Sequence, residues 1–583
     1  MNHPIPSALL LSAMFSFAAP ISSTADSCLT AATQVKQSDA YKAMLNIFTY
    51  DADGKLLANG TGFFISPKGE AASQYALFDG AYRAEAVDFK GNRYSVSRIL
   101  GANRDYDLVR FSLEGVKKCE AFSVTSTACA DGTSLEMVRY ATNKKTAFTP
   151  VSIVKQEPYA DFSYYTVSAA NETSHFALPL VDKAGQLVAI VQKNVGKDAQ
   201  SACAIDARFI SKLNIQAISA LNRDLRAIHI TKALPSEPRE ALNYIYMLPS
   251  SDSLAISNAY ADFIAAYPQM PDGYLGRAAL HAAKQQYAKA ETDLQTALEK
   301  ASDGQSSDSI TTTDAIHYQF SDLMLRSLTQ SADSASLQQQ GWTLQRALDE
   351  AEKAYQTQPL PLYVMQQGKC LLAMKRYAEA HEKYLAVTHK KGFDTSENFY
   401  LAARSLELAS GDAKEVIVLL DSAIQAIPRP VNARNAQYFL ERSQRLLLQK
   451  RFRDAVMDYN EYEKAVGPRN LTDRFYYLRY EAETQAHMYQ QALDDIRTAI
   501  SSSASPLPYR LEEALFLLRI GEFQQALTAA TELLKDLPEN PDCYKIVGIA
   551  YGEMGKKQPA QQNLQKAKSL GDTTVDTFIQ KYK

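Results

Sequence analysis

The chain has 583 residues with a formal net charge of −3, and 46% of its residues are hydrophobic while 22% are charged. This is the composition of an ordinary globular protein, and the length suffices for several domains or a long repeat array. Nucleic-acid binders usually carry a local or global basic excess, and no run of Lys and Arg stands out here. We therefore expect no nucleic-acid partner.

Residues 1–25 have the features of an export signal. The apolar stretch from Ala8 to Ile21 is too short to span a bilayer comfortably, and small residues follow at Ser23 to Ala25. The alternative to an export signal is that this segment forms a buried N-terminal helix. We expect a periplasmic or extracellular protein without a transmembrane segment. A lipoprotein attached at Cys28 is the less favoured interpretation, because the preceding residues Asp26-Ser27 are not typical of the sequence before a lipidated cysteine.

Up to about residue 210 the chain has the pattern of β-strands. Short runs rich in Val, Phe, Tyr and Thr alternate with turns marked by Gly, Asp and Asn, as in Asp53-Gly54 and Asp131-Gly132. The runs include residues 45–50, 62–66, 85–89, 94–99, 164–168 and 186–192. Many short strands at this spacing predict a closed all-β architecture.

From about residue 238 the period becomes helical, and a residue set recurs. Each set has a first residue that is usually aromatic, a small residue three positions later, and apolar residues four and three positions further on, which is one face of a helix. The sets begin at Tyr287, Tyr377, Phe452, Tyr489, Phe523 and Lys557, and the last three lie about 34 residues apart. This spacing resembles the tetratricopeptide repeat; an unrelated helical array is the alternative.

The resemblance implies helix-turn-helix units that stack into a superhelix with an extended concave face. We count about nine units between residues 238 and 574, interrupted by a Ser-rich stretch at 302–308 and a Ser/Gln stretch at 330–340.

In such a unit the recurring set marks the second helix, and the first helix begins about thirteen residues earlier and lines the inner face. This offset predicts a binding row of apolar, aromatic and charged residues that suits an extended peptide with apolar side chains and at least one carboxylate. The row consists of Met365, Lys369, Tyr400, Arg404, Leu440, Gln444, Tyr477 and Glu481. The alternative is that Tyr400 and Tyr477 only fill gaps between neighbouring helices.

Four segments in the β region carry a second resemblance. They are residues 60–65 (GTGFFI), 69–81 (GEAASQYALFDGA), 105–109 (DYDLV), and 174–180 (SHFALPL) followed by 185–190 (GQLVAI). Their order and spacing resemble the trypsin-like serine proteases. The implied fold is a double β-barrel.

Residue by residue, the resemblance places Ala76 at the general base, Asp107 at the catalytic Asp and Phe176 at the nucleophile. Ala and Phe supply neither the imidazole nor the hydroxyl of a Ser-His-Asp triad. We therefore expect that the chain is not an enzyme. We expect Asp107 to cap a turn or to hydrogen-bond with the backbone. A hydrolase with a displaced site is the alternative, with His175 as its candidate residue, although a lone His in a loop is more often structural.

Four cysteines lie in the first domain, an even number that permits disulfides in an exported protein. We favour Cys28 with Cys119, a pairing that the trypsin-like resemblance suggests, and Cys129 with Cys203. Connectivity stays open, since four cysteines allow three pairings. No pair has zinc or redox spacing, so we expect no cofactor or metal; Cys370 and Cys543 lie in separate repeats and should stay unpaired.

The expected order is a signal peptide (1–25), a trypsin-like pseudoprotease domain (26–215), a linker (216–237), a tetratricopeptide array (238–574) and a tail (575–583). The fold class is multidomain, an all-β trypsin-like double barrel followed by an all-α superhelix.

The leading function is an exported, non-enzymatic protein-binding scaffold. Its β domain acts as a second binding module or only caps the array. Self-association is left open.

Overall fold

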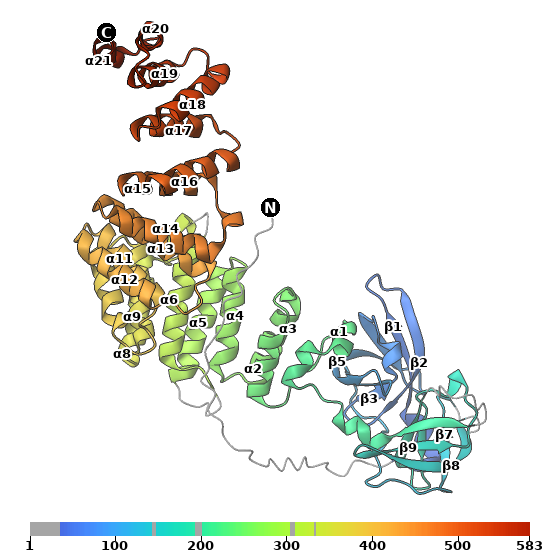
Figure 1. Ribbon diagram of the computed structural model, residues 1–583. Coiled ribbons are helices and arrows are strands. Elements are labelled where there is room, and N and C mark those ends of the chain that lie inside the picture. Colours follow the sequence, from blue (N-terminus) through green and yellow to red (C-terminus); the bar gives the residue numbers. More distant parts are fainter. Residues whose placement is uncertain (1–34, 143–146, 193–200, 303–308, 331–333) are drawn as a thin grey trace. The chain divides into compact units, whose positions relative to one another are not determined.

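The computed structural model describes residues 35–142, 147–192, 201–302, 309–330 and 334–583 (Figure 1). The expected signal peptide and Cys28 lie outside the described residues. Contacts divide the chain into two compact units, with the division between Gly273 and Tyr274. No helix in the described part of the chain is both long enough and apolar enough to cross a membrane.

The first unit contains two closed, antiparallel, six-stranded β-barrels, as the sequence predicted. The first barrel has the order β1-β2-β3-β6-β5-β4, and the second β10-β11-β12-β9-β8-β7. The strands of the first are β1 (Met44–Tyr50), β2 (Leu56–Phe64), β3 (Glu70–Ser73), β4 (Arg83–Val87), β5 (Arg93–Asn103) and β6 (Leu108–Leu113). Those of the second are β7 (Ser134–Val138), β8 (Phe148–Tyr159), β9 (Phe162–Val167), β10 (Pro179–Val181), β11 (Leu187–Gln192) and β12 (Ala202–Asp206).

One apolar core runs through both barrels. Met44 and Phe63 of the first barrel belong to the same buried cluster as Leu180 and Ile190 of the second. Strand β1 alternates buried and half-buried residues, which is the period of a strand with one inward face. Strand β11 is buried along its whole length. The two barrels therefore form a single packed body.

The segment after the barrels packs against the first barrel instead of forming a free linker. It contains the short helices η6 (Ala217–Leu221) and α1 (Arg223–Ala227). The Ile99 amide on β5 donates to Thr231 O at 2.9 Å, and the Ala233 amide donates to Ile99 O at 2.8 Å. These two hydrogen bonds add residues 231–233 to the edge of β5.

The first two long helices, α2 (Pro238–Met247) and α3 (Ser253–Ala266), are grouped with the barrels, although we expected the repeats to begin here. Helix α2 packs on η6. Arg98 on β5 donates two hydrogen bonds to Asp262 on α3, at 2.8 and 3.2 Å. A bidentate Arg–carboxylate pair sets orientation as well as distance, so α3 is held firmly to the first barrel.

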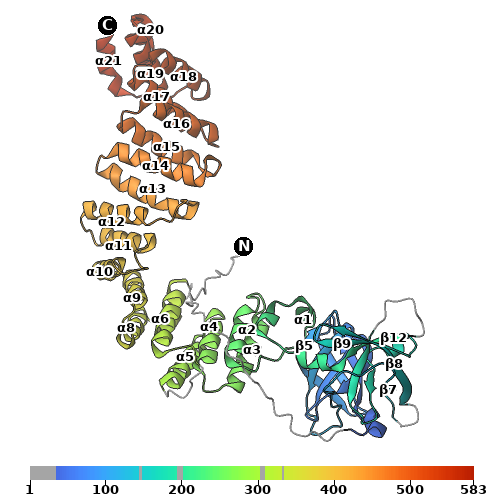
Figure 2. The ribbon, with the colours of Figure 1, turned by 60° about the horizontal axis from the view of Figure 1, so that its bottom comes forward.

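The second unit is a helical array, and helix α4 spans the division between the units. Its paired helices follow one another in chain order (Figure 2). They are α4 (Pro271–Ala283), α5 (Tyr287–Ser302), α6 (Thr313–Gln330), α7 (Ser334–Gln339), α8 (Leu344–Thr357), α9 (Pro361–Ala373), α10 (Tyr377–Thr388), α11 (Ser396–Leu408), α12 (Ala413–Gln425), α13 (Ala433–Leu448), α14 (Phe452–Val466), α15 (Asp473–Gln485), α16 (Tyr489–Ser502), α17 (Leu507–Arg519), α18 (Phe523–Asp536), α19 (Pro541–Glu553), α20 (Lys557–Ser569) and α21 (Asp576–Lys581).

The predicted starts of the second helices are confirmed. Helices α5, α10, α14, α16, α18 and α20 each begin at the first residue of a recurring set. The first helices begin about one turn earlier than the expected offset of about thirteen residues. Proline explains part of this difference, because Pro271, Pro361 and Pro541 occupy the first helical position, where a missing N–H has no consequence.

The small residue of each set lies at the contact between paired helices. Ala380, Ala455, Ala492, Ala526 and Ala560 all have zero exposure. A side chain of this size lets two helix backbones approach closely. The sequence pattern therefore specifies both where the second helices begin and which face they bury.

We predict that Gly101→Ala destabilises the first unit. A Cβ at Gly101 would lie 2.3 Å from the Leu213 carbonyl carbon, so the backbone after the barrels must shift. The expected loss in free energy of unfolding is about 1–3 kcal/mol, typical of overpacking, measured by calorimetric unfolding of the full chain.

Gly60→Ala is the matched control, because its Cβ would meet only the flexible end of the Leu77 side chain at 2.6 Å. An equal or smaller loss for Gly101→Ala than for Gly60→Ala would show that the segment is not tightly packed on β5.

Candidate functional site

In the first barrel, the structure brings together two of the three residues assigned to the protease-like site. Ala76 lies in the short helix η2 (Tyr75–Leu77), and Asp107 precedes β6 with a φ of 48°. The Ala76 amide donates to Asp107 Oδ1 at 2.8 Å, and Gln74 Nε2 donates to Asp107 Oδ2 at 3.4 Å. Asp107 thus makes the backbone hydrogen bond that we expected of it.

In the second barrel, Phe176 follows the short helix η4 (Thr173–His175) and is half-buried. The neighbouring His175 is 5% exposed. Its Nδ1 lies 2.7 Å from Ala170 O, so it donates there, and its Nε2 lies 2.6 Å from Arg139 Nη2, so it accepts. Both ring nitrogens of His175 are therefore engaged in contacts that hold the loop.

No family model and no curated protein matches the chain. Among solved structures, an inactive mutant form of Rv3671c from M. tuberculosis H37Rv has 16% sequence identity and a TM-score of 0.26, over 34% of this chain and 91% of that one. The active form of the Rv3671c protease has 17% identity and a TM-score of 0.26, over 34% and 85% of the respective chains. The first unit has a trypsin-like double-barrel fold.

These matches contradict the expectation that the chain is not an enzyme. The matched structures are those of a protease, and one of them is an active form. The lack of an imidazole at Ala76 and of a hydroxyl at Phe176 therefore does not establish that the chain is inactive. At this level of identity the match itself shows the fold alone.

The predicted bridge between Cys129 and Cys203 is absent, because both are free thiols, as is Cys119. The Cys129 amide donates to Tyr165 Oη at 3.2 Å, whereas the Cys203 thiol is hydrogen-bonded to Tyr164. Tyr164 and Tyr165 are successive residues of β9, and successive strand residues point to opposite faces. The Cys129 amide and the Cys203 thiol therefore contact side chains on opposite faces of that strand. The proposed partner of Cys119, Cys28, lies outside the described residues.

The predicted binding row falls on four successive first helices of the array. Met365 and Lys369 lie on α9, Tyr400 and Arg404 on α11, Leu440 and Gln444 on α13, and Tyr477 and Glu481 on α15. Arg404, Gln444 and Glu481 are exposed, and the other five are half-buried. The row therefore presents polar groups to solvent above a partly buried apolar base.

The two tyrosines of the row connect neighbouring first helices. Tyr400 on α11 contacts Tyr438 on α13, with ring centroids 5.1 Å apart. Tyr477 on α15 contacts Tyr509 on α17, with centroids 5.3 Å apart. Both tyrosines therefore do fill gaps between helices, as the alternative interpretation held. Their half-buried state leaves part of each side chain accessible.

A charged group near the row was missed from the sequence. Arg445 on α13 donates to Glu407 on α11 at 2.7 Å and to Glu441 at 2.6 Å. Its partner Glu407 lies 38 positions away. No local sequence signal indicates that pair, because it depends on how successive units stack.

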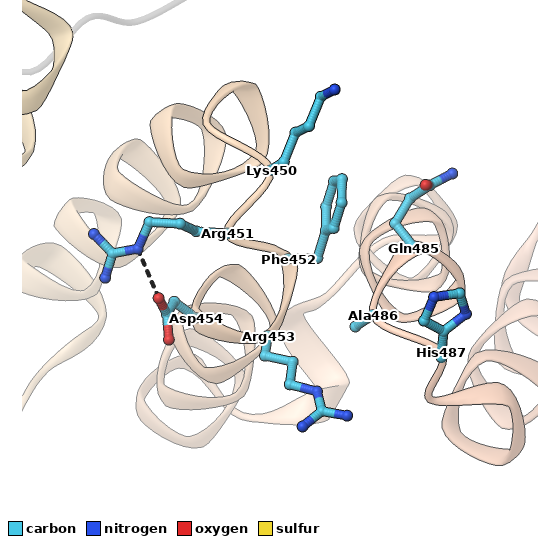
Figure 3. A pocket seen from close by; sticks show the side chains of 8 residues that line it. All are labelled: Lys450, Arg451, Phe452, Arg453, Asp454, Gln485, Ala486 and His487. Carbon is cyan, nitrogen blue, oxygen red and sulfur yellow. Dashed lines mark hydrogen bonds and ion pairs between the residues drawn. The ribbon is translucent and has the colours of Figure 1, made fainter.

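A second missed feature is a shallow, largely open cationic cavity of about 290 Å³ between the turn before α14 and the end of α15. Lys450, Arg451, Arg453 and His487 line it, and the Phe452 ring stands between Lys450 and the end of α15 (Figure 3). Arg451 is paired with Asp454 at 2.7 Å. The run Lys450-Arg451-Phe452-Arg453 is the signal that could have identified this cavity from the sequence.

Arg–Asp pairs in which the Asp is buried join the two helices of several units. Arg442 on α13 makes two hydrogen bonds to Asp458 on α14, at 2.8 and 2.6 Å. Arg479 on α15 makes two to Asp495 on α16, at 2.6 and 2.9 Å. Arg277 on α4 pairs with Asp293 on α5 in the same way. These pairs orient each first helix relative to its second helix.

The Arg479 cluster holds more carboxylates than its one cation can pair. Arg479 also donates to Glu463 at 2.6 Å, and Glu483, 3% exposed, is 4.0 Å from Arg479 Nε. Glu483 Oε2 is buried without a hydrogen-bond partner among the described residues. Burial and the nearby Asp495 carboxylate raise the pKa of Glu483 to about 8. Glu483 is therefore protonated in the folded protein at neutral pH.

We predict that Glu483→Gln stabilises the second unit at alkaline pH. Because the folded-state pKa is raised, the folded protein holds an extra proton between the ordinary value near 4.5 and about 8, so stability falls as pH rises through that window. The variant should lose this part of the pH dependence and exceed the wild type at pH 9 by about 1–3 kcal/mol, measured by urea unfolding.

Glu481→Gln is the control, since Glu481 is exposed on the same helix. Equal pH dependence in Glu483→Gln and the wild type would contradict a protonated Glu483.

Proposed function

We propose that this chain is an exported protein-binding scaffold whose second unit is a tetratricopeptide-type array that binds an extended peptide along its first helices. The observation that carries the proposal is the row on α9, α11, α13 and α15, where polar and charged residues stand exposed above half-buried aromatic and apolar ones. Such mixtures of Tyr, Arg and apolar groups are typical of interface anchors.

The charges of the row favour a peptide with a carboxylate. Arg404 is exposed on α11, and Lys369 is half-buried on α9. The nearby Arg445 is already paired with Glu407 and Glu441, so Arg404 and Lys369 are the better candidates to meet a ligand carboxylate. An Arg–carboxylate contact is often bidentate, which gives orientation to the bound segment.

The cationic cavity beside α15 supports the same ligand chemistry. It combines the Phe452 ring with the cations Lys450 and Arg453. An acidic side chain next to an apolar one fits such a lining. The double barrel is proposed as a second binding module or as a cap of the array.

The test is a double substitution, Arg404→Glu with Tyr477→Ala, in the full chain. Ligands are first selected from a library of short peptides that combine apolar and acidic residues, and affinities are measured by fluorescence polarisation. We expect a loss of more than about a hundredfold, near 2.7 kcal/mol, with unchanged helical content by circular dichroism.

The matched control is Lys414→Glu with Met457→Ala, which makes the same kinds of change on second helices. Lys414 is exposed on α12, and Met457 is 59% exposed on α14. Affinity of the test variant within about twofold of the wild type, or equal losses in test and control, would mean that the first helices are not the binding face.

A further inference from the structure

The first unit contains a cavity of about 380 Å³ that none of the features above uses. It lies between the segment after the barrels and the helices α2 and α3, entirely within residues 219–262. Cavities of a few hundred cubic ångströms are the size that small organic ligands occupy.

The lining of the cavity is mixed, and one part of it is apolar. Leu225, Ile228, Ile230 and Leu248 line it, together with Tyr244. Leu225 and Ile230 are buried, and Leu254, which also lines the cavity, is 70% exposed. This lining suits the apolar body of a ligand, since burial of apolar surface is the main source of affinity in such pockets.

Lys232 is one of the charged residues that line the cavity. Its backbone is held by the pairing of residues 231–233 with β5, which fixes where the side chain enters. The ammonium donates to Ile228 O, and it forms no ion pair with any carboxylate of the described residues. An ammonium has three donors. Lys232 is half-buried, and the Asp252 carboxylate attracts its charge from beyond ion-pair distance. Burial lowers the pKa of Lys232 to about 8.

The acidic residues at the cavity are already engaged. Asp262 accepts both hydrogen bonds from Arg98, and Asp252 caps α3 by accepting from the Ala255 amide at 3.0 Å. Arg226 is exposed at the same cavity and adds a second positive charge. Arg226 and Lys232 therefore carry two positive charges against the single negative charge of Asp252, which leaves room for one anionic group at the cavity.

We propose that this cavity binds a small organic acid, with its apolar body between α1, α2 and α3 and its carboxylate accepting hydrogen bonds from Lys232. The site lies in the first unit and is independent of the peptide-binding face, so either proposal can fail without the other.

The experiment uses the full chain and decanoate as the probe, with decanol as the uncharged probe, and isothermal titration calorimetry as the measurement. We expect saturable decanoate binding, and decanol binding that is at least about tenfold weaker. Lys232→Met should reduce decanoate affinity by at least about tenfold and leave decanol affinity unchanged. Lys212→Met, in the short helix η5 (Ala207–Lys212) away from the cavity, is the matched control and should bind both probes as the wild type does.

Two further measurements keep the proposal testable if Lys232→Met fails to fold. Ala255→Trp should fill the cavity and remove binding of both probes. In the wild type, decanoate should protect Lys232 from reductive methylation, read by mass spectrometry, and should raise its pKa because a carboxylate stabilises the ammonium.

The proposal is overturned if decanoate does not bind saturably, or if decanol binds as tightly as decanoate. It is also overturned if Lys232→Met and Lys212→Met bind decanoate equally, or if decanoate leaves the methylation rate of Lys232 unchanged.

Discussion

The close approach of paired helices at a buried alanine is the constraint on which the second unit depends. Ala380, Ala455, Ala492, Ala526 and Ala560 have no exposed surface, and each lies three residues into its helix. A larger side chain there would push the first helix outward. Because the same spacing recurs along the array, every unit places its first helix in a similar position, and a row of residues on successive first helices becomes possible.

The Arg–Asp pairs act on the same helix pairs. The pairs Arg442–Asp458 and Arg479–Asp495 are bidentate. Each pair therefore sets the orientation of the first helix relative to the second, whereas the buried alanine sets the distance between them. Around Arg479 the excess of carboxylates is accommodated by a raised pKa at Glu483 instead of by further cations. Tyr477 and Glu481 of the proposed binding face lie on the same helix as this cluster.

In the first unit, specific contacts join elements that are distant in sequence. Gly101 leaves room for the Leu213 backbone, and Ile99 pairs with residues 231 and 233. The Arg98–Asp262 pair then attaches α3 to β5 across 164 positions. The cavity with Lys232 is a consequence of this arrangement, since its floor comes from the segment after the barrels and its cover from two helices.

The sequence by itself determined the periodic features. These are the β class of the first part, the starts of the second helices, and the position of the residues of the proposed binding row on first helices. These follow from side-chain periods of two and 3.6 residues, which local sequence carries directly. It did not determine whether Cys129 and Cys203 meet, that α2 and α3 join the barrels, or that Glu407 meets Arg445. No sequence pattern indicated that Lys232 would line a cavity. Those features arise from contacts between residues far apart along the chain, which only the packing of the elements decides.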